Sequence, residues 1–599
     1  MSETLTAVKS LLNGGEFLVK ESNFKDVFTP DNLNEEQKMI VDTVVSFVET
    51  EILPVYDKIE HQEPGLTESL LLKAGELGLL GLAIPEEYGG MGKDFNTNSL
   101  LVEYMAKSRS FSLSLGAHIG IGTLPIVYFG NETQKQHYLP KLASGELKAC
   151  YCLTEPSSGS DALGAKTTAM LNSEGTHYIV NGQKMWITNS GFADVFIVFC
   201  QIEGNKFSCL ILEKGMDGLT LGAEEKKMGI KGSSTRQVFL ENVKVPKENL
   251  LGEIGKGHLI AFNILNIGRY KLAAGVLGGS KNAIEQSVKY ALERQQFKTP
   301  IASFGAIQYK IAEMATRVYA LQSACYRTSD MIDNKEKELV ANGKAYQEAI
   351  MLSAEEYAIE CSLLKFIGSE VLNYCVDENV QIHGGMGYSE ELPAAGAYRD
   401  ARINRIFEGT NEINRLLSVD MLVKRAMSGK VDIMTAAMAV QKELMSVPDF
   451  GSNEDNTPLA AETVAVNNAK KAILMAAGAA VQKLMTKLKN EQEILMNIAD
   501  MLAEVFSMES TILRTKKLID ANGEAASAIQ IDMTKVFISD AMERINIFGK
   551  HCLQSFAEGD ELRIMLMGLK RFTKYEIVNT KEARRRIAAK ILEEGKYAF

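Results

Sequence analysis

The sequence predicts a mainly helical protein with an antiparallel β domain in the middle of the chain. Three changes in residue pattern support this fold class. Residues 34–144 repeat apolar side chains at helical spacing, and residues 148–253 alternate β-branched and aromatic runs with Gly, Asn and Asp turns. Residues 257–424 return to long helical patterns, and a further helical region follows to the C-terminus.

These changes divide the 599 residues into five expected parts. They are an N-terminal extension (1–33), an N-terminal helical domain (34–147), a middle β domain (148–256), a helical bundle (257–427) and a C-terminal helical domain (428–599). The stretch Pro448–Pro458, PDFGSNEDNTP, is expected to be an exposed acidic loop or hinge. Three roles are open for the last domain, an interface, a lid or a membrane-surface module, and an interface is preferred.

Composition narrows the class of protein. The formal net charge of −11 argues against broad nucleic-acid binding. The eight cysteines show no zinc-ligand spacing, and we expect reduced, buried thiols and no metal site. Neither a secretory signal nor a membrane-spanning run is recognised, so the expected compartment is the cytoplasm or the mitochondrial matrix.

One helix of the C-terminal domain leaves membrane contact open. Apolar positions within 460–484 lie beside Lys470 and Lys471, a pattern that suits either an interfacial helix at a membrane surface or a buried helix with lysines at its edge. The buried helix is the preferred interpretation.

One acid, Glu408, stands at a glycine-marked break in the stretch ARINRIFEGTNEINRLLS. Gly409 permits a tight turn, and Thr410 or Asn411 is placed to cap the helix that follows. Glu408 is therefore either a first-turn acid favoured by the helix dipole or a general base facing a pocket. Local residues alone favour the first.

Two glycine-rich segments have more than one interpretation. GAHIGIGTLP, residues 116–125, indicates tight helix packing or the lining of a deep pocket, with packing preferred. QIHGGMGY, residues 381–388, lacks the strand-first spacing of a dinucleotide fold; it is either a helix-ending loop or a close backbone approach to a dinucleotide across a subunit boundary.

The β domain opens with YCLTEPSSGSDALGAKTTA, a loop rich in backbone N–H groups and hydroxyls. It differs from a P-loop because one extra residue separates Gly164 from Lys166 and because strands are expected to follow. Further on, Trp186 and Thr188 in NGQKMWITNS would share one face of a strand. A core tryptophan and a contact for a flat heteroaromatic cofactor are both open.

Five motifs together resemble one family. YCLTEPSSGSD, NGQKMWITN, RQQFKTPIASFGAIQ, QIHGGMGY and RIFEGTNEI occur in the order found in the flavin-dependent acyl-CoA dehydrogenases, over roughly residues 34–424. The extra C-terminal domain resembles the very-long-chain branch. The resemblance implies N-terminal helices, a middle β domain and a four-helix bundle, with FAD held between domains and subunits of at least a homodimer.

The resemblance also assigns site residues. Glu408 matches the catalytic base that removes the α-proton of an acyl-CoA while the β-hydrogen leaves as hydride to the flavin, and burial beside flavin and acyl chain should raise its pKa. FAD contacts are expected from Tyr151, Leu153, Thr154, Ser160, Trp186, Ile187, Thr188, Thr410 and Glu412, and from Arg294, Phe297, Phe304, Gln308, Gln381, Gly384 and Gly385 of a neighbouring subunit. Substrate contacts are expected from Ser160, Asn266, Arg269 and Gly409.

Some relatives place the base near Gly268, but residues 261–280 contain no Asp or Glu. Glycines at 268 and in 116–122 remove bulk where the family's acyl tail lies, which favours a long or medium-long chain, and glycine helix packing explains them nearly as well. The predicted function is therefore dehydrogenation in fatty-acid β-oxidation, with electrons passed to an electron-transferring flavoprotein. Two alternatives remain: an assembly or scaffold protein with residual catalysis, and an acyl-CoA oxidase.

Overall fold

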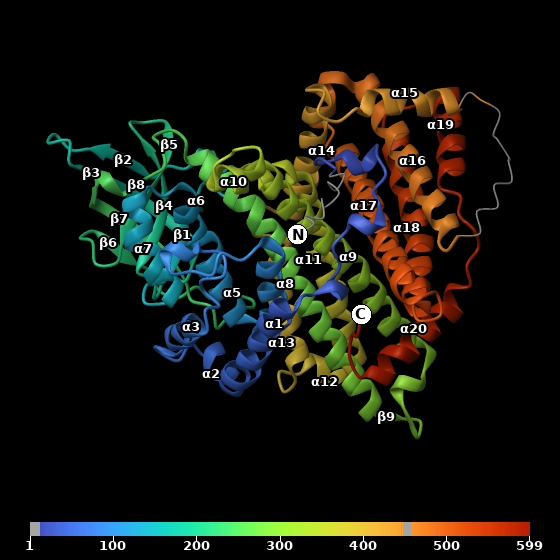
Figure 1. Cartoon of the computed structure of the whole chain (residues 1–599), viewed down its shortest axis with the longest axis horizontal. Coiled ribbons are helices and arrows are strands. Elements are labelled where there is room, and N and C mark those ends of the chain that lie inside the picture. Colours follow the sequence, from blue (N-terminus) through green and yellow to red (C-terminus); the bar gives the residue numbers. More distant parts are fainter. Residues whose placement is uncertain (1–11, 445, 447–456) are drawn as a thin grey trace, which may run out of the picture.

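The computed structural model describes residues 12–444, 446 and 457–599. Helices and one sheet follow each other in the predicted order, which confirms the fold class (Figure 1). The acidic loop predicted at 448–458 lies almost wholly outside the described residues.

The N-terminal region is a set of short helices joined by tight turns. Asn34 and Gln37 form a capping box at the first of them, and Asn131 and Gln134 form another at the last. Its helices are α1 (Glu35–Phe47), α2 (Tyr56–Glu60), α3 (Leu66–Glu76), α4 (Phe95–Met105), α5 (Ser110–Ala117), α6 (Leu124–Phe129) and α7 (Glu132–Ser144). A π-helical turn, η8 (His118–Gly122), joins α5 to α6.

The stretch Ser110–Phe129 is long and apolar enough to cross a membrane by length and composition alone, whereas no such run is expected from the sequence. Of its most apolar window, 78% is buried inside the protein. Its hydrophobicity is that of a core helix, because these residues pack between other elements of the fold.

The middle region is one twisted sheet of eight strands, in the order β6-β7-β3-β2-β4-β5-β8 with β1 beside β4. The strands are β1 (Ala149–Cys152), β2 (Thr168–Leu171), β3 (His177–Thr188), β4 (Val195–Ile202), β5 (Lys206–Glu213), β6 (Leu219–Leu221), β7 (Thr235–Pro246) and β8 (Leu250–Leu251). Most pairs are antiparallel, as predicted. The pairs β1–β4 and β2–β4 are parallel, which the long connections before β4 permit.

The bundle consists of the long helices α8 (Gly257–Glu293), α9 (Gly305–Ala341) and α11 (Ala358–His383), with α14 (Asn411–Met427) against α11. Between them lie α10 (Tyr346–Glu356), α12 (Gly385–Tyr388) and α13 (Pro393–Ala401). A two-stranded hairpin, β9 (Gln295–Gln296) and β10 (Thr299–Pro300), joins α8 to α9.

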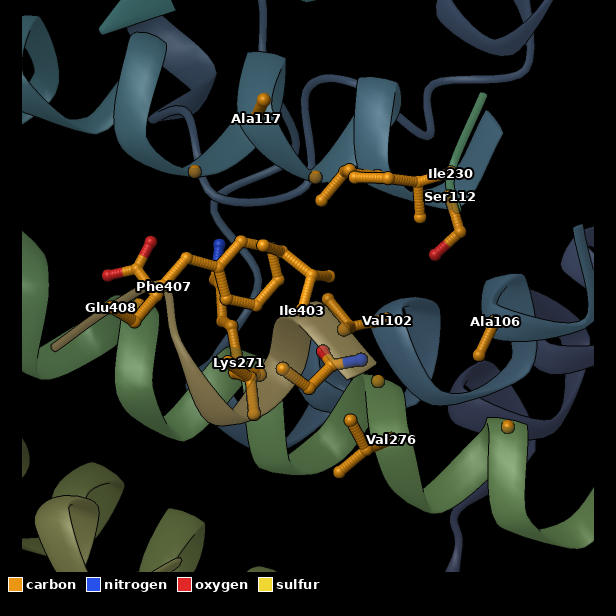
Figure 2. Close-up of a pocket in the computed structure, with 18 of the residues that line it drawn as sticks. Val102, Ala106, Ser112, Ala117, Ile230, Lys271, Val276, Ile403, Phe407 and Glu408 are labelled. Carbon is orange, nitrogen blue, oxygen red and sulfur yellow. The ribbon is translucent and has the colours of Figure 1, made fainter. Parts of the chain in front are cut away.

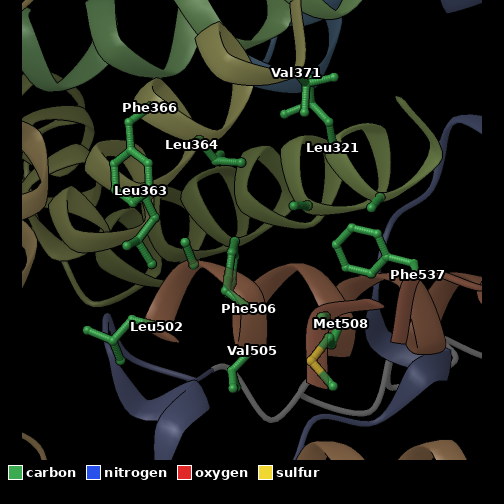
Figure 3. Close-up of a cluster of buried hydrophobic side chains, with 14 of the residues drawn as sticks. Leu321, Leu363, Leu364, Phe366, Val371, Leu502, Val505, Phe506, Met508 and Phe537 are labelled. Carbon is green, nitrogen blue, oxygen red and sulfur yellow. The ribbon is translucent and has the colours of Figure 1, made fainter. Parts of the chain in front are cut away.

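The C-terminal region packs on the side of the bundle away from the sheet (Figure 1). It contains α15 (Ile433–Leu444), α16 (Ala460–Leu484), α17 (Gln492–Asn522), α18 (Ala528–Gln554), α19 (Gly559–Phe572) and α20 (Thr580–Glu594). Phe506 and Met508 of α17 belong to the same buried cluster as Leu321 and Leu363 of the bundle (Figure 3). The two regions therefore share one hydrophobic core.

Buried charges join these regions as well. Glu509 of α17 accepts hydrogen bonds from Arg327 of α9 at 2.7 Å and from Lys470 of α16 at 2.6 Å. Lys470 is buried in this cluster, so the face of α16 that carries it packs inside the protein, in agreement with the buried helix preferred from the sequence. All eight cysteines are buried and free, and Cys150 and Cys152 share one face of β1 with their sulfurs 3.8 Å apart.

Candidate functional site

Glu408 lies in a strained turn between the 3₁₀ turn Arg402–Arg405 and α14. Its φ is +58° and that of Gly409 is +79°, and Thr410 caps α14 by accepting from the backbone N–H of Ile413. The side-chain amide of Asn414 donates to the carbonyl oxygens of Glu408 (3.3 Å), Gly409 (2.8 Å) and Thr410 (3.0 Å). A non-glycine residue at positive φ is uncommon and tends to occur where a side chain must be presented.

The Glu408 carboxylate points toward α8 at Gly268. A Cβ added at residue 268 would lie only 2.7 Å from its Oε2, so glycine is needed there for the carboxylate to keep this position. Oε2 is buried and has no hydrogen-bond partner among the described residues. Burial raises the pKa of Glu408 to about 7, although Arg269 and Lys365 oppose that shift.

The two cations hold the backbone around the acid. Arg269 donates from Nε to the carbonyl oxygen of Glu408 at 3.4 Å and from an NH group to Asn266 at 2.7 Å. Lys365 of α11 donates to the Asn411 side chain at 2.8 Å, and burial lowers its pKa to about 8. The structure places Asn266 and Arg269, the residues expected to contact the substrate, in buried positions beside the acid.

A mostly apolar cavity of about 250 Å³ extends from Glu408 (Figure 2). One wall is a single face of α8, and most of the remaining lining comes from α4, α5, η8 and the segment 397–408. The α8 residues are Ile264, Ile267, Gly268, Lys271, Leu272, Gly275, Val276, Gly279 and Asn282. The site is therefore a narrow channel with a carboxylate on its wall.

In the glycine segment 116–125, some glycines line the channel and another is needed for tight packing. Gly116 and Gly120 line the channel, and a Cβ at Gly116 would meet no atom within 4 Å. A Cβ at Gly122 would lie 2.8 Å from the Ala149 Cβ, so this glycine is required for packing against β1. Both functions predicted for the segment occur, at different residues.

Trp186 lies outside the core, so the cofactor-contact interpretation remains. A β-bulge in β3 between Lys184 and Ile187 gives Trp186 a φ of +57° and leaves it 59% exposed, which interrupts the alternation expected for a regular strand. Ile187 is buried, and Thr188 lines the channel. The backbone N–H of Met185 donates to Thr154 at 2.9 Å, which joins the bulge to the segment after β1.

The rest of that segment is held by a buried ion pair that the sequence analysis missed. Lys184 lies 2.7 Å from Glu155, whose carboxylate also accepts from the backbone N–H groups of Lys166 and Thr167. This pair orders the loop that carries Ser160, which is exposed. Tyr151 and Leu153 are buried, and the strand β2 follows the loop, so the rejection of a P-loop is confirmed.

A second group of predicted residues lies at the far end of the bundle. Arg294 lies directly before the β9–β10 hairpin, Phe297 lies in it, and Phe304 and Gln308 follow it. Gln381, Gly384 and Gly385 lie at the end of α11. The two ends meet where Tyr290 stacks on His383 with ring centroids 4.3 Å apart. Phe297 is 89% exposed, and added Cβ atoms at Gly384 and Gly385 would meet nothing within 4 Å.

This second group does not join Glu408 within one chain. Arg294 follows Gly268 by 26 residues along α8, which places them ~39 Å apart at the helical rise per residue. Thr410 and Glu412, in contrast, lie directly beyond the acid at the start of α14.

Comparisons with known proteins cover nearly the whole chain. Family models described as the N-terminal, middle and C-terminal domains of acyl-CoA dehydrogenase match residues 34–146, 150–243 and 255–423, and a second model of a C-terminal domain matches 468–571. A probable acyl-CoA dehydrogenase of Bacillus subtilis is 50% identical over 584 residues, 98% of each chain.

Two further relatives bear on cofactor and substrate. The human mitochondrial very long-chain specific acyl-CoA dehydrogenase is 39% identical over 398 residues, 65% of this chain and 58% of that protein. A crystal structure of an acyl-CoA dehydrogenase complexed with FAD from Bacillus anthracis superimposes with a TM-score of 0.95 at 51% identity, over 98% of this chain and 100% of that one.

Proposed function

This chain belongs to the acyl-CoA dehydrogenase family and is a FAD-dependent enzyme, and we propose that it oxidises long-chain acyl-CoA in fatty-acid β-oxidation with Glu408 as the base. One observation carries this proposal: a buried carboxylate, with its pKa raised to about 7, on the wall of an apolar channel. A base with a pKa close to the working pH is suited to proton removal.

The residues present fit a flavin. Trp186, held at positive φ on a bulge, offers an aromatic face, and Thr188 offers a hydroxyl in the channel. The buried Tyr151 hydroxyl has no hydrogen-bond partner among the residues that the structure describes. Trp186, Ile187, Thr188 and the segment Tyr151–Ser160 would hold the ring, with Thr410 and Glu412 near the remainder. FAD, when bound, accepts the β-hydrogen of the substrate as hydride.

Glu408 performs the complementary half of the reaction. Its carboxylate takes the α-proton, while Arg269 and Asn414 fix the backbone carbonyl oxygen of the same residue. The backbone N–H of Glu408 and the Gly409 turn are proposed to orient the thioester carbonyl, whose polarisation acidifies the α-proton. The channel walls exclude water from the acyl chain.

The length of the channel supports a long acyl chain. On α8 the lining runs from Gly268, beside Glu408, to Asn282, a separation of ~21 Å at the helical rise per residue. An extended alkyl chain advances about 1.3 Å per carbon, because its C–C single bonds of about 1.5 Å zigzag about the chain axis. The part of the channel between Gly268 and Asn282 is therefore long enough for an extended chain of about sixteen carbons.

The test is anaerobic mixing of the FAD-loaded protein with saturated acyl-CoAs from butyryl to stearoyl, with flavin bleaching as the readout. The proposal predicts the highest kcat/KM for long chains, and a maximum at butyryl-CoA would contradict it. Electron-transferring flavoprotein is proposed as the electron acceptor. Rapid reoxidation by air with stoichiometric peroxide would instead identify an oxidase.

We further propose a homodimer whose flavin sites are completed by the neighbouring subunit. The second group of residues, in the hairpin and at the end of α11, presents exposed aromatic and open glycine surfaces too far from Glu408 of the same chain to serve it. A two-fold symmetric pair would bring this group to the partner's site.

A further inference from the structure

Lys271 is a cation in the wall of the acyl channel, one helical turn beyond Gly268 on α8. Its stem passes Gly120, and the side chain crosses from α8 toward η8 (Figure 2). Its Nζ is fully buried and has no hydrogen-bond partner in the described part of the chain. Burial lowers its pKa to about 8, and no carboxylate among the described residues balances its charge.

A second cavity begins at the same lysine. This side chamber, of about 30 Å³, shares Leu124, Ile267 and Lys271 with the acyl channel. In contrast to the channel, much of the lining of this side chamber is polar. The polar side chains are those of Lys93, Asn98, Tyr128, Glu336 and Tyr346. Lys271 therefore stands where a polar chamber adjoins an apolar channel.

An unpaired buried ammonium is unfavourable, and a channel that takes only alkyl chains has no use for it. A methionine would fill the same length without that cost. The burial of Nζ, its lack of a partner and its position between channel and chamber are all explained if the missing hydrogen-bond acceptor arrives with the ligand.

On the basis of the proposed function, we propose that Lys271 makes the channel a binding site for acyl-CoA whose chain carries an acceptor oxygen, as a hydroxyl, keto or carboxylate group. Lys271 follows Gly268 by three residues, ~4.5 Å along the helix. The oxygen is therefore placed about four carbons beyond the α-carbon, at about the sixth carbon of the chain.

The experiment compares matched substrates on the FAD-loaded protein. One pair is hexadecanoyl-CoA and its analogue hydroxylated at about the sixth carbon. Another is hexanoyl-CoA and hexanedioyl-CoA, and a hydroxyl at the chain terminus is the positional control. Dissociation constants and kcat/KM are measured for the wild type, for Lys271→Met, and for Lys289→Met, which removes an exposed lysine of the same helix.

The preference for the oxygenated over the plain chain, measured as a ratio of kcat/KM, should be about tenfold or more larger in the wild type and in Lys289→Met than in Lys271→Met. This is the range for a hydrogen bond from a charged donor. Lys271→Met should accept the plain alkyl chain at least as well as the wild type. An oxygenated-to-alkyl ratio that is unchanged in Lys271→Met would overturn the proposal and would mean that water in the side chamber solvates the amine.

A second variant separates a neutral acceptor oxygen from a carboxylate. Lys271→Gln keeps a donor without the charge. It should retain the preference for the hydroxylated chain if a neutral oxygen is the ligand, and it should lose the preference for hexanedioyl-CoA if a carboxylate is the ligand. A wild type that prefers neither the hydroxylated chain nor hexanedioyl-CoA over its plain counterpart would also overturn the proposal. Flavin bleaching by plain hexadecanoyl-CoA reports the proposed function separately, since it does not require Lys271.

Discussion

Glu408 is a carboxylate that burial drives toward its protonated form while Arg269 and Lys365 favour its charged form. Tyr151 is close enough for the charge of Glu408 to raise the pKa of its phenol further, after the larger effect of burial. The acid therefore titrates in the range where a base must work, and its protonation state is open to single substitutions around it.

The pH dependence of flavin bleaching should report this titration. A base acts only when deprotonated, so kcat/KM should rise as pH increases through about 7 and level off above it. Lys365→Met removes a cation that lowers the pKa of Glu408, so the midpoint should move to higher pH. Stopped-flow bleaching over a pH series measures this, with Lys289→Met as the control, and an unmoved midpoint in Lys365→Met would contradict it.

The sequence predicts the role of some single residues in the site and not of others. Glu408 could be identified from the sequence because the glycine-marked break beside it is local and its motif resembles a known one. Lys365 and Lys271 were missed because their roles depend on Asn411, far along the chain, and on two cavities. The signal in the sequence is a lysine within an apolar helical run, LLKFIG or GRYKLA, which a snorkelling surface lysine would produce equally.

At the scale of elements, the channel depends on where the glycines of α5 and η8 lie. Gly116 and Gly120 face the cavity and Gly122 faces β1, and periodicity alone does not distinguish them. The π-helical turn shifts the register by one residue between these positions, and such turns often occur at functional sites.

Two matched substitutions separate the roles of these glycines. Gly116→Leu places a side chain in the channel, so it should shift the chain-length profile toward shorter acyl-CoAs with little effect on folding. Gly122→Leu should instead destabilise the protein by about 1–3 kcal/mol or more, because its Cβ meets Ala149 and the Ala117 carbonyl oxygen. Chain-length profiles and thermal melts distinguish the two, and the same profile shift in both variants would contradict the assignment.

The sheet shows the limits of sequence prediction for elements. Its strands were predicted from alternating apolar residues, and most pairings are antiparallel as expected. The parallel pairings of β4 and the bulge at Trp186 were not predicted, because pairing partners and register are set by tertiary packing.

At the scale of the whole molecule, the C-terminal domain shares one hydrophobic core with the bundle. The sequence marked it as helical but did not identify the face that it covers, since an apolar helix face does not specify its partner. Glu509, buried between Arg327 and Lys470, is the ionic centre of this contact, and those two cations outweigh burial to lower its pKa.

Glu509→Gln should therefore destabilise the protein strongly. It leaves two buried cations without a counter-charge, a loss of about 3–5 kcal/mol in the free energy of unfolding. Asp420→Asn, which breaks the exposed pair with Lys424, should cost at most about 1 kcal/mol. Chemical denaturation of both variants checks this, and losses of equal size would show that the buried cluster does not hold the domains together.

The proposed dimer predicts complementation between two inactive variants. Glu408→Gln lacks the base, and Arg294→Ala lacks a residue that serves the partner's flavin site. In a mixed dimer, one site combines an intact Glu408 with an intact Arg294 from the other chain, so co-expression should restore activity at that site. Activity no greater than that of either variant alone would show that Arg294 serves its own chain.

The central claim, that Glu408 is the base of a FAD-dependent dehydrogenation, is tested most directly by one comparison. FAD-loaded wild type and Glu408→Gln are mixed anaerobically with hexadecanoyl-CoA, and the flavin absorbance is followed. The wild type should bleach, while Glu408→Gln should keep its FAD and bind substrate but remain yellow. Bleaching of Glu408→Gln at the wild-type rate would contradict the claim.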